Sequence, residues 1–567
     1  MIPRMDVQKP WVAYFSMEIA LEPHIPTYSG GLGVLAGDTL RSGADLGLPI
    51  VGVTLVHRKG YFRQRLDRGG EQAADPDPWR PEEKAELLDG TISVTIEGRR
   101  VVVSAWRYWI RGANHQVPVY LLDTASSENS PWDQTLTDHL YGGDAHYRLC
   151  QEVVLGIGGV RMLRRLGHSK ITTFHMNEGH SALLSLALLE EQIGDADLEK
   201  ATEDDIEEVR EKCVFTTHTP VPAGQDQFSR DLMRQILGHD LASVLEVTHC
   251  CPESLLNMTF LALRFSRYVN GVAMRHGEIS QDMFPRYPIR AITNGVHATT
   301  WTSASFQAIY DLHLPGWRRD NVYLRYAIKI ALDEIRQAHS QAKSVLIEAI
   351  KDCVGEPLDP TAFTLGFARR AATYKRAKLV LSDPERLISI ARSVGPIQLI
   401  FAGKAHPRDD GGKSLIREVI EMSSRYACDA LRIVYVPNYD MEWGKLITSG
   451  VDLWLNTPQR PQEASGTSGM KASLNGVPSL SVLDGWWVEG CIEGVTGWSI
   501  ASDGDTHGLS ETESLYAKLA NTILPMFYQQ PDAYGAVMRS SIAINGSFFN
   551  TQRMVTQYLT NAYAPED

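Results

Sequence analysis

The stretch AFTLGFARR, residues 362–370, is a short apolar run that stops at two arginines. Three more runs of this kind follow in the second half of the chain: IQLIFAGKA (397–405), LRIVYVPN (431–438) and VDLWLNT (451–457). Each is followed by a glycine or a polar turn and then by a helical pattern. Short apolar runs that alternate with helices predict parallel strands in a doubly wound α/β sheet.

The first half of the chain repeats this arrangement. Its apolar runs are LPIVGVTLVH (48–57), VPVYLLDT (117–124), ITTFHMNEG (171–179) and KCVFTTHTP (212–220). Two series predict two α/β domains, which we place at residues 1–294 and 295–567, with the last helix packing back on the first domain. Functional loops then lie at the carboxyl ends of the strands, facing the cleft between the domains. The segment GEQAADPDPWRPEE (70–83) predicts a proline-rich acidic loop or the approach to a hairpin.

Length and composition narrow the functional classes. A chain of 567 residues is too long for a single core, and its 43% hydrophobic and 22% charged residues are typical of a globular protein. The 55 Lys and Arg against 68 Asp and Glu give a net charge of −13, which argues against a general nucleic-acid or membrane-surface binder. A local basic pocket for a small anion remains compatible with this total.

The cysteines and the N-terminal sequence predict a cytoplasmic protein. Of the seven cysteines only Cys250 and Cys251 are adjacent, and the spacing matches neither a metal site nor a disulfide framework. The first residues show no basic-then-apolar leader, and no run of about 18 apolar residues occurs. We therefore expect reduced thiols and no bound metal.

Candidate anion-binding groups follow the predicted strands. The glycine-rich segment YSGGLGVLAGD (28–38) could turn backbone N–H groups toward an anion, although such loops also serve tight turns. The cluster GFARRAATYKR (366–376) is a candidate phosphate site or the basic start of a surface helix. The segments NEGH (177–180) and THTP (217–220) each place a histidine after a strand, where a plain hydrogen-bonded loop histidine is the alternative.

The segment EASGTSGMKASLNG, residues 463–476, surrounds Lys471 with small residues. Small residues let a backbone approach a bulky ligand, and a helix that starts there directs N–H groups at an anion. A desolvated lysine can form a Schiff base with an aldehyde, so a pyridoxal phosphate site is one explanation. A buried ion pair between Glu463 and Lys471 is the other, and the residues alone leave both open.

A resemblance to a known family adds to this reading. The segment 463–476 with LDGWWVEG (483–490) behind it resembles the cofactor site of the α-glucan phosphorylases, which act on glycogen, starch and maltodextrin. The likeness extends over nearly the whole chain, through YFSMEIA, GGLGVLAGDTLRSGADLGLP, NEGH, THTP, VNGVAMRHGE, TNGVHATTW, ARRAATYKR and NGSFFNTQRM. The length is similar to that of the compact prokaryotic form. The resemblance implies two Rossmann-like domains facing a deep cleft, the GT-B architecture.

The resemblance also implies roles for individual residues. Lys471 would hold pyridoxal 5'-phosphate covalently, and the residues that would surround the cofactor phosphate are Thr467, Arg369 and Trp301. The substrate phosphate would be held by Arg370 and Lys375, assisted by the loop amides around Gly30, Gly31 and Leu32.

The sugar contacts implied by the family are distributed over both halves of the chain. Glu463 would bind a sugar hydroxyl together with Ser465, Gly466 and Tyr374. Asn294 and His218 would contact the glucosyl 6-hydroxyl, with the carbonyl of His218 near the reacting carbon. His180 and Glu178 belong to a second loop that lines the cleft.

The implied reaction is reversible phosphorolysis of a terminal α-1,4-linked glucosyl unit to α-D-glucose 1-phosphate with retention. The first domain would carry the glucan and part of the substrate site, and the second the pyridoxal phosphate site. The partners would then be α-1,4-glucan, inorganic phosphate and glucose 1-phosphate, in a homo-oligomer that we expect to be a dimer. Because the aromatic motif begins near residue 12, we expect no N-terminal phosphorylation switch and no allosteric control.

One departure and two rival functions remain. In LYGGDAHYR (140–148), Ala145 stands where the family has a glucose-contacting asparagine, so Asp144 or His146 compensates or glucose is held differently. A retaining nucleotide-sugar glucosyltransferase resembling glycogen synthase would keep Glu463 but needs a second acidic residue eight positions on, where Lys471 stands. A non-catalytic glucan-binding protein predicts erosion of the basic residues, all of which are present.

Overall fold

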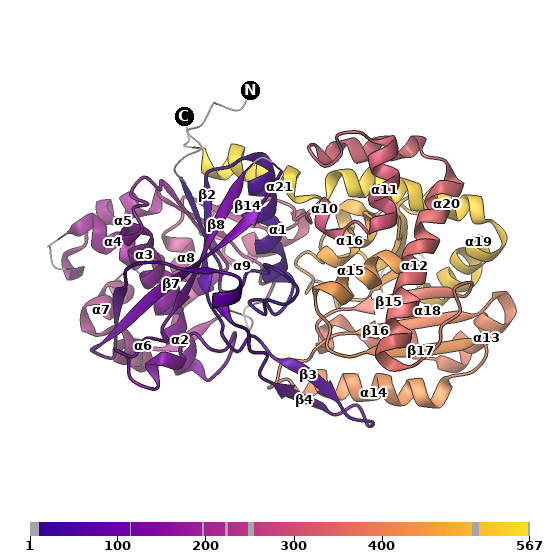
Figure 1. Cartoon of the computed structure of the whole chain (residues 1–567), viewed down its shortest axis with the longest axis horizontal. Helices are drawn as coiled ribbons and strands as arrows, with labels where there is room; N and C mark the ends of the chain where they lie inside the picture. Colours follow the sequence, from indigo (N-terminus) through magenta and orange to yellow (C-terminus); the bar gives the residue numbers. More distant parts are fainter. Residues whose placement is uncertain are drawn as a thin grey trace. The chain divides into compact units, whose positions relative to one another are not determined.

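The computed structural model divides the chain into two compact units (Figure 1). The first unit comprises Met1–Phe62, Pro76–Thr293 and Met554–Asp567, and the second comprises Arg63–Asp75 and Asn294–Arg553. The structure describes residues 11–113, 115–194, 198–221, 225–247, 255–501 and 510–564. Cys250 and Cys251 therefore lie outside the described residues, and the other five cysteines are free thiols.

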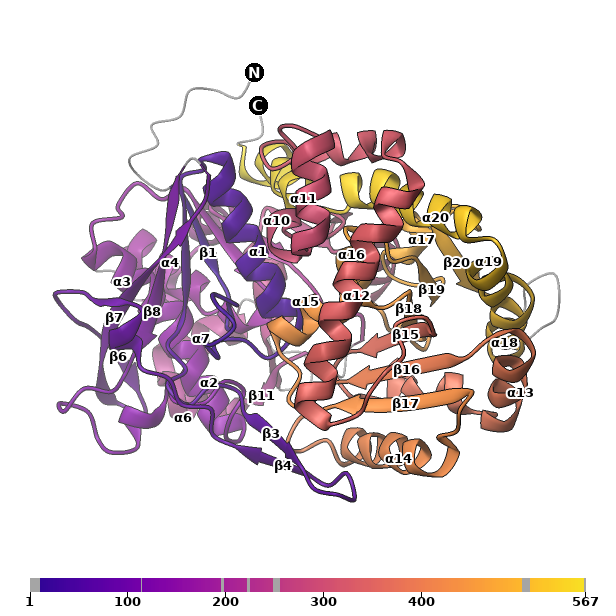
Figure 2. The same cartoon turned by 45° about the vertical axis from the view of Figure 1, so that its right-hand side comes forward.

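The second unit contains a six-stranded sheet in which every neighbouring pair is parallel (Figure 2). The sheet has the order β17-β16-β15-β18-β19-β20. Its strands are β15 (Phe363–Ala368), β16 (Ile397–Ala402), β17 (Leu431–Val436), β18 (Leu453–Asn456), β19 (Ser479–Val482) and β20 (Gly497–Ile500). In chain order this is 3-2-1-4-5-6, the order of dinucleotide-binding folds. The four strands predicted in this half of the sequence are confirmed.

Helices cover this sheet because each strand is followed by one, as the sequence pattern predicts. The main ones are α12 (Leu332–Val354), α13 (Pro384–Val394), α14 (Asp410–Tyr426), α15 (Met441–Gly450) and α16 (Thr467–Ser473). Helix α12 packs against α15 and β17, while α15 packs against β15. The apolar strand β15 is buried at every position, as expected for a strand covered on both faces.

The first unit is built around a mixed sheet of the order β14-β13-β10-β9-β1-β2-β8-β7-β5. Its parallel part consists of β1 (Val12–Phe15), β2 (Ile50–Leu55), β8 (Gln116–Asp123), β9 (Thr173–Asn177), β10 (Cys213–Thr216), β13 (Tyr268–Gly271) and β14 (Ile289–Ala291). In chain order this is 7-6-5-4-1-2-3, which contains the same reversal as the second sheet. The four strands predicted here are confirmed.

An antiparallel extension of this sheet was not predicted. Strand β7 (Arg99–Arg111) pairs antiparallel with β8, with β5 (Glu86–Leu87) and with β6 (Ile92–Ile96). Several residues of β7 are exposed or half-buried, including charged residues at both ends, so it lacks the continuous apolar run that marks a buried parallel strand.

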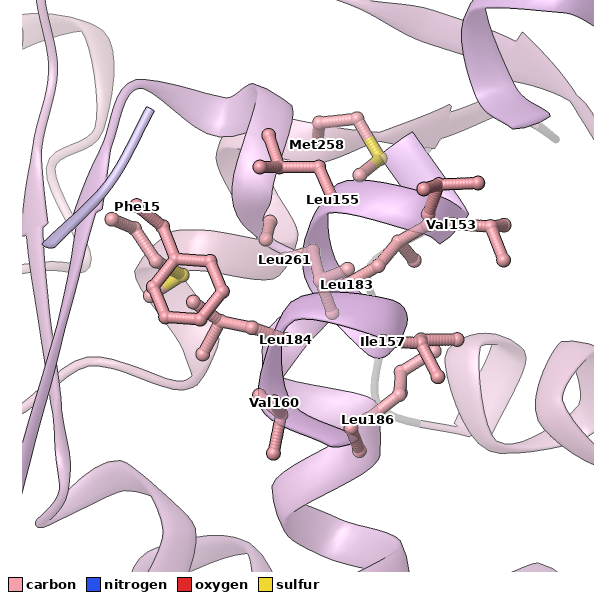
Figure 3. Packing of buried hydrophobic residues seen from close by; sticks show 14 of the residues in the cluster. Phe15, Val153, Leu155, Ile157, Val160, Leu183, Leu184, Leu186, Met258 and Leu261 are labelled. Atoms are coloured by element: carbon pink, nitrogen blue, oxygen red, sulfur yellow. The ribbon is translucent and has the colours of Figure 1, made fainter. Parts of the chain in front are cut away.

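The core of the first unit surrounds a helix that changes its winding. Helix α2 (Ala145–Val153) continues through a π-helical segment (Val154–Gly158) into α3 (Gly159–Arg165). Figure 3 shows Phe15 of β1, Leu155 of the π-helical segment and Leu184 of α4 (Leu184–Ile193) in one buried cluster. This packing places the π-helical segment beside the turn Gly179–Ser181, which follows β9.

The end of the chain packs in the first unit. Tyr558, the last residue of α21 (Thr551–Tyr558), forms hydrogen bonds through its hydroxyl with Thr216 Oγ1 and Asn270 Nδ2, both at 3.0 Å. The Tyr563 hydroxyl lies 2.6 Å from Nδ1 of His175.

Each sheet has one point where the strand order reverses: between β1 and β9 in the first unit, and between β15 and β18 in the second. Ligands of such sheets bind outside the carboxyl ends of the strands at this point. The segments there are residues 16–18 and 177–180 in the first unit, and 369–376 and 457–471 in the second. The sequence-predicted site residues concentrate in these segments.

Candidate active site

In the second unit, a buried carboxylate lies between two cations. Oε2 of Glu463 accepts a hydrogen bond of 2.5 Å from Nη2 of Arg369, and both carboxylate oxygens lie 2.8 Å from Nζ of Lys375. Arg369 follows β15 directly, Lys375 lies in the next turn, and Glu463 is in the loop after β18. The reversal of strand order thus brings residues that are 94 and 88 positions apart into one cluster.

The charges of this cluster interact strongly because all three side chains are buried, where water screens them little. Burial by itself raises the pKa of the Glu463 carboxyl, but Arg369 and Lys375 outweigh burial and lower this pKa from 4.5 to about 2. The backbone N–H of Glu463 is bound by Asp484, at 2.9 Å from Oδ2. The Lys375 ammonium also lies 4.5 Å from the ring centroid of Tyr374, which places Tyr374 beside the cluster.

Lys471 is buried in α16, eight residues beyond Glu463, and is 6% exposed. Its Nζ lies 3.5 Å from the ring centroid of Trp301, the last residue of α10 (Ala298–Trp301). The side chain of Asn475 donates to the backbone oxygens of both residues, at 3.0 Å to Lys471 and 2.9 Å to Trp301. The lysine and the tryptophan are therefore held together from the backbone as well as through their side chains.

The small residues before Lys471 have a packing reason. Gly466 has a φ of +88° and precedes Thr467, the first residue of α16. A Cβ on Gly469 would lie 2.6 Å from Cζ2 of Trp486, so only glycine lets α16 lie against this indole. The predicted helix start is confirmed, and the close contact with Trp486 explains one of the small residues before Lys471, Gly469.

Two buried polar atoms of this cluster and its loop have no hydrogen-bond partner among the described residues: Nη1 of Arg369 and Oγ of Ser465. The same holds for Oδ1 of Asn294, elsewhere in the second unit. Burying a polar group without a partner is costly, so such atoms point to a ligand or ordered water. Arg370, next to Arg369, is exposed. Asn294 is the first residue of the longer segment of the second unit, and its backbone oxygen accepts a hydrogen bond from Nη2 of Arg553 at 2.9 Å.

In the first unit, a buried glutamate organises the glycine loop. Oε2 of Glu18 accepts hydrogen bonds from the backbone N–H of Ser29 at 2.6 Å and of Gly30 at 3.2 Å. A Cβ on Gly33 would lie 2.6 Å from the same oxygen, which explains one glycine of this loop. The Gly30 amide is thus used within the protein, while Gly31 and Leu32 begin α1 (Gly31–Leu46), where first-turn N–H groups have no partner in the helix.

Glu178 fixes the loop that carries His218. Its Oε2 accepts from the backbone N–H of His218 at 2.8 Å and from the Thr219 hydroxyl at 2.9 Å. The Nε2 of His218 lies 2.7 Å from Oδ1 of Asn177. Burial, with a smaller contribution from neighbouring histidines, lowers the pKa of His218 to about 3, so its imidazole is neutral at pH 7.

His180 belongs to a charged network that the sequence analysis did not identify. Its Nε2 lies 3.2 Å from Oδ2 of Asp226, which also accepts from Nη2 of Arg148 at 3.0 Å. Glu152, fully buried beside Arg148, has an Oε2 without a partner among the described residues, and burial raises its pKa well above the usual value. The i, i+4 spacing of Arg148 and Glu152 in α2 was the available signal.

Asp144 and His146, the two residues that could compensate for Ala145, both form hydrogen bonds with nearby protein groups. Asp144 is the N-cap of α2, where its Oδ1 accepts from the N–H of Tyr147 at 3.0 Å. The Nε2 of His146 lies 2.8 Å from Oε1 of Glu97.

The predicted site residues therefore form two groups. The first unit contains Gly30, Gly31, Leu32, His180 and His218. The second unit contains Asn294, Trp301, Arg369, Arg370, Tyr374, Lys375, Glu463, Ser465, Gly466, Thr467 and Lys471. Among the described residues, no cluster of His, Cys, Asp and Glu has the arrangement of a metal site.

Comparison with known proteins identifies the family. A family model described as carbohydrate phosphorylase matches residues 247–498. Maltodextrin phosphorylase of Thermococcus litoralis is 38% identical to this chain, over 98% of the chain and 70% of the relative. The chain belongs to the carbohydrate phosphorylase family. Two further relatives are glycogen phosphorylases: that of Mycobacterium tuberculosis is 36% identical over 98% of this chain and 71% of its own length. That of Aquifex aeolicus is 34% identical over 99% and 87%.

Membership of the phosphorylase family agrees with the resemblance found in the sequence. The family uses pyridoxal phosphate, and its members transfer glycosyl groups. In the described part of the chain, no helix is both long and apolar enough to span a bilayer.

Proposed function

We propose that this protein is an α-1,4-glucan phosphorylase, which transfers a terminal glucosyl unit to inorganic phosphate and releases α-D-glucose 1-phosphate with retention. The observation that carries the proposal is Lys471, buried against Trp301 and eight residues beyond the Glu463 cluster. Relatives named maltodextrin and glycogen phosphorylase support the choice of substrate.

The residues around Lys471 fit pyridoxal 5'-phosphate. A buried amine is suited to hold an aldehyde, and the unpartnered Nη1 of Arg369 is a buried donor suited to an anion. In this proposal Lys471 holds the cofactor, and Thr467, Arg369 and Trp301 surround its phosphate. When bound, the cofactor supplies a second phosphate group that acts as a proton partner for the substrate phosphate.

The cationic groups bind the substrate phosphate. Arg370 and Lys375 hold it, and the first-turn amides of Gly31 and Leu32 contribute N–H donors. Concentrated positive charge is needed because two phosphates that lie close together repel each other. A proton passes from the substrate phosphate to the glycosidic oxygen as the bond to the anomeric carbon breaks. A phosphate oxygen then forms the new bond to that carbon on the same face.

The remaining residues orient the sugar. Glu463 accepts a hydrogen bond from a sugar hydroxyl, and Ser465, Gly466 and Tyr374 contact the sugar beside it. The Ser465 hydroxyl has no hydrogen-bond partner among the described residues. Asn294 and the neutral His218 bind the 6-hydroxyl, and the backbone oxygen of His218 stabilises positive charge at the reacting carbon. His180 contributes to the sugar site through its loop.

The wider architecture belongs to the same proposal. The two units are the two domains of a GT-B fold, in which the first contributes the glucan site and the second the cofactor site. Closure of the domains excludes water, which would otherwise hydrolyse the glucan. We further propose a cytoplasmic homodimer without a bound metal.

The experiment combines cofactor mapping with turnover. Borohydride reduction of the purified protein should leave a pyridoxyl group on the peptide that contains Lys471, as read by mass spectrometry. Maltodextrin with inorganic phosphate should yield glucose 1-phosphate. Lys471→Ala should lose cofactor attachment, whereas Arg370→Ala should keep it and lose turnover. Activity with a nucleotide sugar and none with phosphate would establish the glucosyltransferase alternative instead.

A further inference from the structure

A hairpin from the first half of the sequence belongs to the second unit. Strands β3 (Arg63–Leu66) and β4 (Gln72–Asp75) pair with each other, and the unit to which they belong otherwise consists of residues 294–553. The chain segments before and after the hairpin belong to the first unit. Something must therefore hold these 13 residues, Arg63–Asp75, in the second unit.

Two glutamine side chains make the contact. Gln72 pairs with the backbone of Ala405, since its Nε2 donates to the carbonyl at 2.8 Å and its Oε1 accepts from the N–H at 3.1 Å. Gln64 is 3% exposed, and its Nε2 donates to the carbonyl of Gly403 at 3.0 Å and to Oε1 of Gln72 at 2.8 Å. Its Oε1 accepts from the N–H of Asn438 at 2.7 Å. Both side chains thus hydrogen-bond to the backbone of the segment 403–405, directly beyond the end of β16.

The segment 403–405, which these glutamines bind, also contacts the loop after β15 that begins with Arg369 and Arg370. The backbone N–H of Arg369 donates to the oxygen of Ala402, and that of Ala371 to the oxygen of Lys404, both at 3.0 Å. The two segments lie so close that a Cβ on Gly403 would come within 1.9 Å of the backbone oxygen of Arg369. A shift of Gly403 or Ala405 is therefore passed directly to Arg369 and its neighbour Arg370.

A small apolar cluster reinforces the same connection. Ala371, Ala405 and Ile416 form a separate buried core, and Leu66 of the hairpin packs against it. The hairpin thus contacts the segment 403–405, and this segment in turn contacts the loop that contains Arg369 and Arg370.

We propose that Gln64 and Gln72 are positioning residues that fix the Arg369–Arg370 backbone for phosphate binding, through the segment 403–405. The inference rests on the proposed function, because it takes Arg370 as a group that binds the substrate phosphate and Arg369 as its neighbour at the cofactor phosphate. A hairpin that is distant from them in sequence sets the affinity of the site for inorganic phosphate.

The test variant is Gln72→Met, which keeps the side-chain length and removes both hydrogen bonds without adding charge. We expect KM for phosphate to rise about tenfold, the equivalent of one net hydrogen bond. KM for maltodextrin and cofactor content should stay within twofold of the unmodified protein. Gln64→Met should act in the same direction, and Gln72→Asn, which keeps a shortened amide, should be intermediate.

The matched control is Glu71→Gln, because Glu71 is the neighbouring hairpin residue and its side chain, 56% exposed, forms a surface ion pair with Arg417. This control should leave both KM values unchanged. A second readout is the phosphate concentration that half-saturates the rise in unfolding temperature, which needs no turnover.

Two results distinguish a failure of the positioning role from a failure of the proposed function. If Gln72→Met lowers the unfolding temperature but leaves the phosphate midpoint and KM unchanged, the glutamines are merely structural and the inference is wrong. If the unmodified protein forms no glucose 1-phosphate, the proposed function fails, and the thermal phosphate midpoint still decides whether the hairpin tunes an anion site.

Discussion

The buried Glu463 cluster allows a quantitative test through Glu463→Gln. In the native state Arg369 and Lys375 hold the pKa of this carboxyl at about 2, against 4.5 for an ordinary glutamate. A shift of this size corresponds to about 3 kcal/mol of stability. Because the native pKa is depressed, this contribution is complete above about pH 4.5 and declines as the pH falls toward 2.

Glutamine has nearly the same shape but no charge, so it leaves two buried cations without their counter-ion. We expect the opening free energy of the second unit to drop by about 3 kcal/mol at pH 7, near the lower end of the cost of breaking a buried ion pair. At pH 3 the unmodified protein has already lost most of this contribution, and the difference should shrink to about 1 kcal/mol.

Native-state hydrogen exchange of peptides that cover β15 and β18 is the assay, because it reports on this unit alone. Glu421→Gln on the exposed face of α14 is the control for removing a carboxylate elsewhere in the unit. Equal protection of the Glu463→Gln and Glu421→Gln proteins at pH 7 would show that the Glu463 carboxylate does not stabilise this unit. So would a difference that grows as the solution is acidified.

Three further predictions concern other parts of the chain. Tyr563→Phe removes the hydrogen bond to His175, an imidazole whose pKa is lowered to about 3 by burial. The substitution should lower the free energy of unfolding in denaturant by about 1 kcal/mol at pH 7; an unchanged denaturation midpoint would contradict this. Gly469→Ala forces a methyl group against Trp486 and should destabilise the protein by about 1–3 kcal/mol, with a changed tryptophan fluorescence; full cofactor retention with unaltered fluorescence would count against this packing. Since burial raises the pKa of Glu152 and so favours the uncharged carboxyl, which glutamine resembles, Glu152→Gln should shift the unfolding temperature by less than Glu152→Ala does; equal shifts would show that its polar atoms are not needed.

Local sequence was sufficient for the buried parallel strands. Mainly apolar runs predicted β15 and β2 because a strand covered on both faces buries nearly all of its side chains. The same rule could not find β7, whose two ends, Arg99 and Arg111, are charged and exposed. A strand at a partly solvated position is not distinguished from a polar loop by apolar content alone.

The site was predicted as a set of residues but not as a set of contacts. The residues alone left Glu463 with Lys471 as a candidate ion pair. In the structure the carboxylate binds Arg369 and Lys375, while the Lys471 amine lies over Trp301. Sequence proximity favoured the first pairing, whereas the reversal of strand order produced the second.

Residue types and their spacing were enough to predict two series of strands, the polar residues at the carboxyl ends of these strands and a lysine among small neighbours. These features depend on periodicity and on residue type, which act over a few positions of the chain. Three other features follow from the fold of the chain: the cations that neutralise Glu463, the binding of the Gly30 amide by Glu18, and the place of residues 63–75 in the second unit. Those outcomes depend on contacts between segments far apart in the chain, and burial gives such contacts their strength because it removes the competing water.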